Sequence, residues 1–140
     1  MVEIVWDAKR TATATTGVGA SIQIGDHAPF SPDDLLALAV AGCLMRTCFA
    51  LVEARGVNVL SYASSARTAP ACSSGEPPAI VIHIYIGVGT PADQALVEAL
   101  AAQSIVQSPL ARALAPLLSA TTEVRCLDTT ESEPGPMRPS

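Results

Sequence analysis

The longest apolar run in the chain predicts one helix at its centre. Between Leu35 and Met45 the thiol of Cys43 is the only polar side-chain group, and helix-compatible residues extend the segment to 31–56. A helix that is apolar on every side is buried on every side, so we expect this one to lie inside protein. We do not expect it to span a membrane, because a span needs ~20 apolar residues and Arg46 interrupts the run.

Both ends of this helix are marked by suitable residues. Ser31 is a good N-cap, and Pro32 suits the first helical position. Asp33 and Asp34 face the positive end of the helix dipole. Gly56 can adopt the left-handed conformation that ends a helix.

Alternation of apolar and polar residues predicts strands on either side of the helix. The clearest is 79–88, where isoleucines at every second position line one face while Val81, His83 and Tyr85 line the other. The remaining strands are expected at 2–16 (one extended segment or two short strands), 20–24, 57–68 and 121–127.

Two further helices are expected between the last two strands. Thr90 starts a helix over 90–103, and Ser108-Pro109 starts another over 108–118, which Pro116 bends or ends. This order predicts one α+β domain over 1–127, with an antiparallel sheet and the helices on one side of it. Residues 128–140 have little to bury, so we expect a disordered tail.

Composition narrows the classes of partner. Hydrophobic residues make up 49% of the chain and charged residues 15%, which suggests a large buried interface with a second chain. The net charge of -5 argues against nucleic acid as a partner. No leader segment is visible at Met1, and the four cysteines show no zinc or disulfide spacing. We therefore expect a cytoplasmic protein with free thiols, no metal and no membrane association.

A motif in the long helix resembles a known family. The residues are Pro32-Asp33-Asp34-Leu35 followed by Ala39-Val40-Ala41-Gly42-Cys43, together with the Ser108-Pro109 helix start and the element order over 2–127. They resemble the OsmC/Ohr family, the osmotically inducible protein C and organic hydroperoxide resistance proteins. The resemblance implies antiparallel sheets wrapped around a long central helix in an intertwined homodimer. It also implies a cysteine-based peroxidase that reduces organic hydroperoxides in oxidative stress defence, with no bound cofactor and an external thiol as reductant.

The resemblance also assigns candidate catalytic residues. Cys43 matches the peroxidatic cysteine, Asp33 matches an acid that is usually Glu, and Arg10 is the candidate for the active-site arginine. Ser108 stands where the family has its second cysteine. The resemblance therefore implies a one-cysteine or degenerate peroxidase.

The residues themselves support some of these roles. A cysteine needs a cation to become a nucleophilic thiolate, and Arg46, three residues after Cys43, shares its helix face. Alternatively, Cys43 is a small core residue. Asp33 lies ~15 Å from Cys43 along the helix, so it acts across a dimer, through Arg10, or only as a helix N-terminal charge. Ser108 is expected to cap its helix.

The other cysteines and the two histidines are weaker candidates for site residues. Cys48 lies about 140° around the helix from the candidate nucleophile, so the two cannot easily bond. Cys72 is a possible substitute resolving thiol in a loop, and Cys126 is expected in the core. His27 is a possible pocket residue, and His83 is expected to be a satisfied sheet residue.

Two other functions remain open. A non-catalytic protein with the same fold would bind a small apolar ligand at the dimer interface. A hotdog-type thioesterase also wraps a long helix in sheet, but the paired late helices do not belong to that layout.

Overall fold

A computed structural model describes residues 1–6, 11–25, 28–69 and 75–127 of the chain. The predicted α+β class is confirmed, and the predicted tail at 128–140 lies outside the described residues. The elements, in chain order, are β1 (Val2–Trp6), β2 (Thr11–Thr16), β3 (Ser21–Gly25), α1 (Pro32–Ala54), β4 (Val59–Ala69), β5 (Ala79–Val88), α2 (Pro91–Gln107), α3 (Pro109–Ala113), a 3-10 turn (Ala115–Leu117) and β6 (Leu118–Cys126).

The ends of α1 lie where its capping residues predict. The Ser31 hydroxyl accepts a hydrogen bond of 3.1 Å from the Asp34 N–H, and the Asp34 carboxylate accepts one of 3.1 Å from the Ser31 N–H. This reciprocal pair satisfies two backbone donors that the first turn leaves free. At the other end Gly56 has a φ of 67°, which favours glycine.

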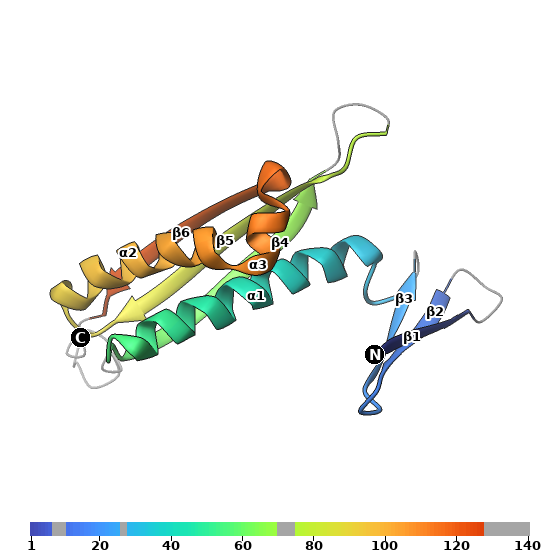
Figure 1. The fold of residues 1–140 in the computed structure, drawn as a ribbon, viewed down its shortest axis with the longest axis horizontal. Helices are drawn as coiled ribbons and strands as arrows, with labels where there is room; N and C mark the ends of the chain where they lie inside the picture. Colours follow the sequence, from blue (N-terminus) through green and yellow to red (C-terminus); the bar gives the residue numbers. More distant parts are fainter. Residues whose placement is uncertain (7–10, 26–27, 70–74, 128–140) are drawn as a thin grey trace, which may run out of the picture.

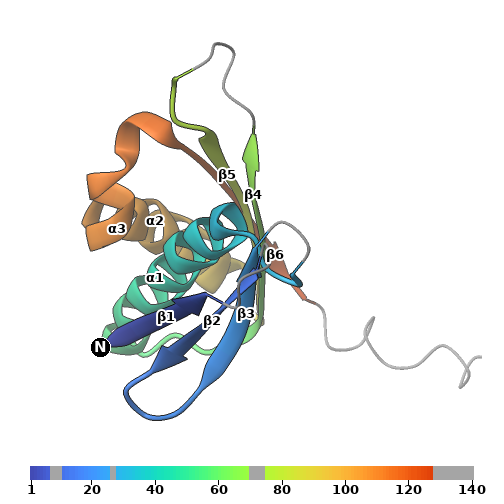
Figure 2. The same cartoon turned by 90° about the vertical axis from the view of Figure 1, so that its right-hand side faces the viewer.

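The larger sheet has the order β4-β5-β6, and all three helices cover one of its faces (Figures 1 and 2). As predicted, alternate residues of β5 point into the core. Their buried side chains pack against α1 and α2. The helices that carry the catalytic candidates are therefore fixed on the hydrophobic core. The central core residues are Val40, Leu44, Val52, Ile80, Ile82, Ile84, Ile86, Val97, Leu100 and Val124.

The prediction of a purely antiparallel sheet is wrong for one pair of strands. β1-β2-β3 and the β4–β5 pair are antiparallel, but β5 and β6 are parallel, from Ile80 opposite Leu118 to Val88 opposite Cys126. After β5 the chain crosses back through α2 and α3 to the end of the sheet where β5 began. Parallel neighbours require such a crossover.

The predicted helix over 108–118 is also too long. α3 ends at Ala113, a 3-10 turn follows, and β6 already begins at Leu118. Pro116 lies within the 3-10 turn, because proline lacks the N–H that an α-helix interior needs. α2, in contrast, continues to Gln107, four residues past its predicted end.

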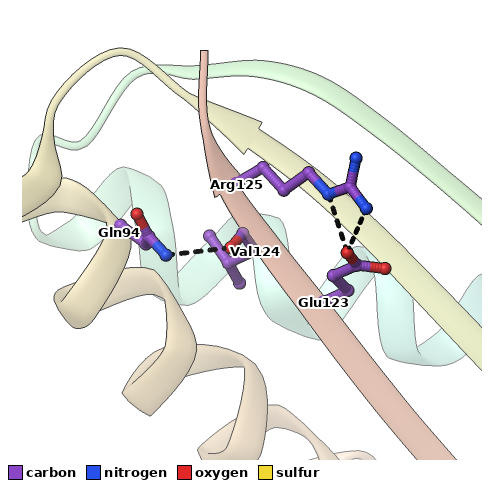
Figure 3. Close-up of polar contacts among 4 residues, drawn as sticks. All are labelled: Gln94, Glu123, Val124 and Arg125. Carbon is purple, nitrogen blue, oxygen red and sulfur yellow. Dashed lines mark hydrogen bonds and ion pairs between the residues drawn. The ribbon is translucent and has the colours of Figure 1, made fainter.

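A side chain joins α2 to the strand beneath it. Gln94 donates a hydrogen bond of 3.2 Å to the carbonyl of Val124 on β6 (Figure 3). Figure 3 also shows Arg125 paired with Glu123, with a nitrogen–oxygen distance of 2.6 Å. Both charged residues are exposed, so they sit on the solvent side of the sheet.

The smaller sheet, β1-β2-β3, stands beyond the N-terminal end of α1 and apart from the larger sheet (Figure 1). Its apolar side chains are largely uncovered, and Trp6 is 70% exposed. One chain does not bury α1 on every side, since Leu38 is 56% and Met45 41% exposed, so the expected burial by a second chain stays a prediction. These faces have no cover because the described chain offers no further element to place over them.

α1 has the length and hydropathy of a membrane span, with a mean hydropathy of 2.2 over its apolar window. The sequence argument that Arg46 makes the apolar run too short for a span is therefore not supported. Its contacts with β4, β5 and α2 instead make α1 the core helix of this fold.

Candidate functional site

The fold brings Cys43 and Ser108 together, although 65 positions separate them in the chain. The Ser108 hydroxyl donates a hydrogen bond to the Cys43 sulfur at an oxygen–sulfur distance of 3.0 Å. Ser108 is 0% exposed and Cys43 is 8% exposed. The sulfur therefore lies at the junction of α1, α2 and α3, almost out of contact with water.

The position of Ser108 explains why its side chain points at α1. Its N–H donates to the carbonyl of Ser104 at 2.8 Å, and its carbonyl accepts from the N–H of Arg112 at 2.9 Å. Both backbone groups are thus used by the flanking helices. The following residue, Pro109, disfavours helical geometry at Ser108, which has a ψ of 124°.

The predicted capping role of Ser108 is wrong. Ser108 occupies the N-cap position of α3, but its side chain makes no capping hydrogen bond. The hydroxyl is instead committed to Cys43. In addition, the backbone N–H of Leu110 in the first turn of α3 lowers the pKa of Cys43, so a donor that a capping serine would have taken acts on the sulfur instead.

These contacts change the acidity of Cys43. Burial raises the pKa of the thiol, whereas the Ser108 hydroxyl, the Leu110 N–H and the Arg46 guanidinium lower it. The three lowering effects together outweigh burial, so the pKa of Cys43 lies below its usual value. Hydrogen bonds to the charged form and a nearby cation both favour ionisation. This arrangement can hold a nucleophilic thiolate.

Arg46 supplies the cation from the same helix. It lies one turn after Cys43, and its positive charge and N–H groups lower the pKa of the thiol. Arg46 is exposed, whereas Ser108 is fully buried. The cation beside the sulfur is therefore in contact with solvent.

The structure does not bring every predicted residue to this site. Asp33 lies in the first turn of α1, exposed and far from Cys43 within one chain. Arg10, His27 and Cys72 lie outside the described residues. His83 is on the exposed face of β5, with its Nδ1 2.6 Å from the Thr121 hydroxyl.

A second thiol, Cys48, lies about one and a half turns after Cys43 along α1. We did not predict from the sequence that it would lie beside a serine of α2. Cys48 is buried and lies beside Ser104 of α2. Burial raises the pKa of this thiol, and the nearby Ser104 hydroxyl offsets only part of that rise. Tyr62 on β4 lies close by, and its hydroxyl has no hydrogen-bond partner among the described residues. Cys48 follows Cys43 by five residues and Ser104 precedes Ser108 by four, and these similar spacings were the only sequence signal for the second pair.

The described residues also show whether a group of side chains could bind a metal ion. Within the described ranges, no three His, Cys, Asp or Glu side chains gather closely enough to hold a metal ion.

Comparison with known proteins addresses the fold. No protein-family model matches the sequence, and no curated protein matches it either. Solved structures do match. An OsmC-like protein from Mycoplasma pneumoniae aligns with a TM-score of 0.72 at 12% identity, covering 91% of this chain and 96% of that one. The chain has the OsmC/Ohr fold.

Two other matching structures belong to proteins whose names state a function. An organic hydroperoxide resistance protein OsmC from Legionella pneumophila aligns with a TM-score of 0.67 at 14% identity, over 89% of this chain and 94% of that one. An organic hydroperoxide resistance protein from Elizabethkingia anophelis aligns with a TM-score of 0.68 at 12% identity, over 91% and 96%. The OsmC/Ohr fold therefore extends over nearly the whole chain.

Proposed function

We propose that this OsmC-fold protein reduces organic hydroperoxides through Cys43, as part of oxidative stress defence. The observation that carries the proposal is the nearly buried Cys43 sulfur, which accepts a hydrogen bond from Ser108 and whose pKa the Leu110 N–H and the Arg46 guanidinium lower further. A purely structural core cysteine needs no such set of donors. The names of the Legionella and Elizabethkingia proteins support the choice of hydroperoxides.

The proposed chemistry uses the thiolate that these donors favour. The Cys43 sulfur attacks the terminal oxygen of the hydroperoxide, a sulfur–oxygen bond forms and the oxygen–oxygen bond breaks. The sulfur is oxidised to a sulfenic acid, and the peroxide is reduced to an alcohol after its leaving oxygen takes up a proton. Arg46 is placed to stabilise the negative charge that develops on the leaving oxygen. Such a cycle needs reduced thiols, which supports a cytoplasmic location.

We also propose that two copies form the active protein. The apolar face of the smaller sheet and the exposed residues Leu38 and Met45 of α1 are uncovered in one chain. Large exposed apolar patches mark interaction surfaces, and a second copy would cover both at once. In such a dimer, Asp33 of one chain would lie near Cys43 of the other chain. Sedimentation velocity should show a dimer at micromolar concentration, and a monomer would contradict this part.

Rapid-mixing oxidation by cumene hydroperoxide tests the catalytic proposal. The reduced protein should lose one thiol with loss of one equivalent of peroxide, and Cys43→Ser should be inactive. Cys126→Ser is the matched control, because Cys126 is at the end of β6, away from the site. If Cys43→Ser consumes peroxide as fast as the parent protein, the proposal is wrong.

A second candidate function rests on a separate cleft. A hollow of about 610 Å³ opens between the end of α2, α3 and the start of β6. Its apolar lining favours a non-catalytic binder of small apolar molecules within one chain, rather than at the dimer interface expected from the sequence. Native mass spectrometry of Cys43→Ser would detect a retained ligand. The lining residues are Ile105, Val106, Ala111, Arg112, Ala115, Leu118, Ser119 and Ala120.

A further inference from the structure

We propose that Ser108 determines how the oxidised site is reduced: it holds the oxygen of a Cys43 sulfenic acid by hydrogen bonding until a small thiol from solution forms a mixed disulfide with Cys43. The inference rests on the proposed peroxide chemistry and concerns the step after it. Its basis is that the hydroxyl oxygen of Ser108, a residue that is 0% exposed, lies 3.0 Å from the Cys43 sulfur and donates to it. A hydroxyl can hold the oxidised sulfur but cannot form a disulfide with it.

The other described thiols are badly placed to replace it. Cys48 is five residues further along the same helix, a rise of ~7.5 Å, whereas disulfides need Cα atoms within about 7 Å. Cys48 also turns towards Ser104 of α2. An intact α1 therefore keeps these two sulfurs apart.

Cys126 is distant for a different reason. It lies opposite Val88 at the end of the sheet where β4 begins, just after the end of α1. Cys43 precedes that end of α1 by eleven residues, or ~16 Å of helix. A disulfide between Cys43 and Cys126 would require the fold to open.

In this proposal the thiol enters on the side of Arg46. Arg46 is exposed and its charge lowers the pKa of Cys43, whereas Ser108 is fully buried. A small thiolate can approach past Arg46 and attack the sulfenic sulfur. A sulfur–sulfur bond forms, the sulfur–oxygen bond breaks, and the oxygen leaves as water after protonation. A second molecule of the same thiol then attacks the mixed disulfide, which restores the Cys43 thiolate and releases the oxidised small disulfide.

Mass spectrometry of the whole chain tests this step. Reduced protein is treated with one equivalent of cumene hydroperoxide, with no thiol present, and trapped with dimedone. We expect dimedone on Cys43 and no disulfide to Cys43 from any cysteine of the same or a second copy, Cys72 included. Addition of 2-mercaptoethanol before dimedone should replace the adduct by a mixed disulfide at Cys43.

Variants at two buried serines make the test specific. In Ser108→Cys we expect a disulfide between positions 43 and 108 and a loss of dimedone labelling of about tenfold or more, because an adjacent thiol has a high effective concentration. Ser104→Ala, equally buried but bonded to Ala101, should behave like the parent protein.

The outcomes separate the two proposals. If Cys43 is not oxidised at all, the proposed function is wrong and this inference falls with it. If Cys43 is oxidised but forms a disulfide within the protein, only this inference is wrong. Persistent dimedone labelling in Ser108→Cys, with no disulfide to position 108, would also overturn it.

Discussion

Ser104 donates its hydroxyl proton to the carbonyl of Ala101 at 2.6 Å, within its own helix. Ser108, one turn later, donates its proton to the sulfur of Cys43 instead. The two buried serines thus donate to different acceptors, and only Ser108 gives its proton to a sulfur. Burial keeps the pKa of Cys48 raised, whereas the pKa of Cys43 is lowered.

The first prediction concerns this difference in reactivity. Iodoacetamide at neutral pH should alkylate Cys43 well before Cys48 in the folded protein, because only Cys43 has a lowered pKa. The measurement is peptide mapping over a time course. In urea the two rates should converge, since the donors are lost. Equal rates in the folded protein would contradict the assignment.

Removal of the Ser108 hydroxyl should raise the pKa of Cys43. A hydrogen bond to a charged group contributes about 1.5–3 kcal/mol, so Ser108→Ala should move the midpoint of alkylation against pH upward by at least about one unit. Below that midpoint, the rate should fall about tenfold at each pH. Ser104→Ala is the control and should leave the midpoint in place.

Tyr62 is expected to make stability fall in alkaline solution. Burial, and then the neighbouring Cys48, raise the pKa of Tyr62 to about 12. The unfolded chain loses this proton near pH 10, so the free energy of unfolding falls between about pH 10 and 12.

Tyr62→Phe should flatten that decline in the free energy of unfolding, measured with urea at several pH values. At pH 7 the change should stay within about 1 kcal/mol, because the lost hydroxyl has no partner in the described part of the chain. Tyr85→Phe, on an exposed ring, controls for loss of a phenol.

Gly42 offers a test of the dimer proposal. A Cβ at Gly42 would meet nothing within 4 Å in one chain, so Gly42→Ala should stabilise an isolated α1 by ~1 kcal/mol through helix propensity. Leu38 and Met45 share the face of Gly42, and a second helix packed there would leave no room for the methyl group. We therefore expect weaker self-association by sedimentation equilibrium despite the better helix. An unchanged dissociation constant would mean that this face is not the interface.

Gly87 should tolerate alanine poorly. A Cβ there would lie 2.6 Å from the Leu127 side chain and also against the Ser61 hydroxyl. Overpacking of this kind costs about 1–3 kcal/mol, measurable as a lower urea midpoint. Gly89→Ala, where the nearest atom would be at 3.7 Å, should cost less. Equal losses would show that crowding at Gly87 is not the cause.

The sequence predicted best what depends on neighbouring residues. The limits of α1 follow from Ser31 and Gly56, whose effects are local, and the inward face of β5 follows from alternation alone. The parallel pairing of β5 with β6 was missed because it depends on the path of the crossover, which no short pattern records.

The site shows the same division. Arg46 was found because it shares a helix face with Cys43, whereas the role of Ser108 was mistaken for a cap. A cap and a tertiary donor use the same residue type, and only the packing of α2 and α3 on α1 decides between them. Leu110 had no signal at all, because its contribution is a backbone N–H.

The separation of Cys43 from Ser108 by 65 positions makes the sulfur an internal probe of folding. A nascent or unfolded chain carries an ordinary thiol at position 43, since the hydroxyl that acidifies it arrives only when the crossover has packed. Enhanced reactivity at this one atom would therefore report, without any attached label, that the last helices and β6 have reached their places.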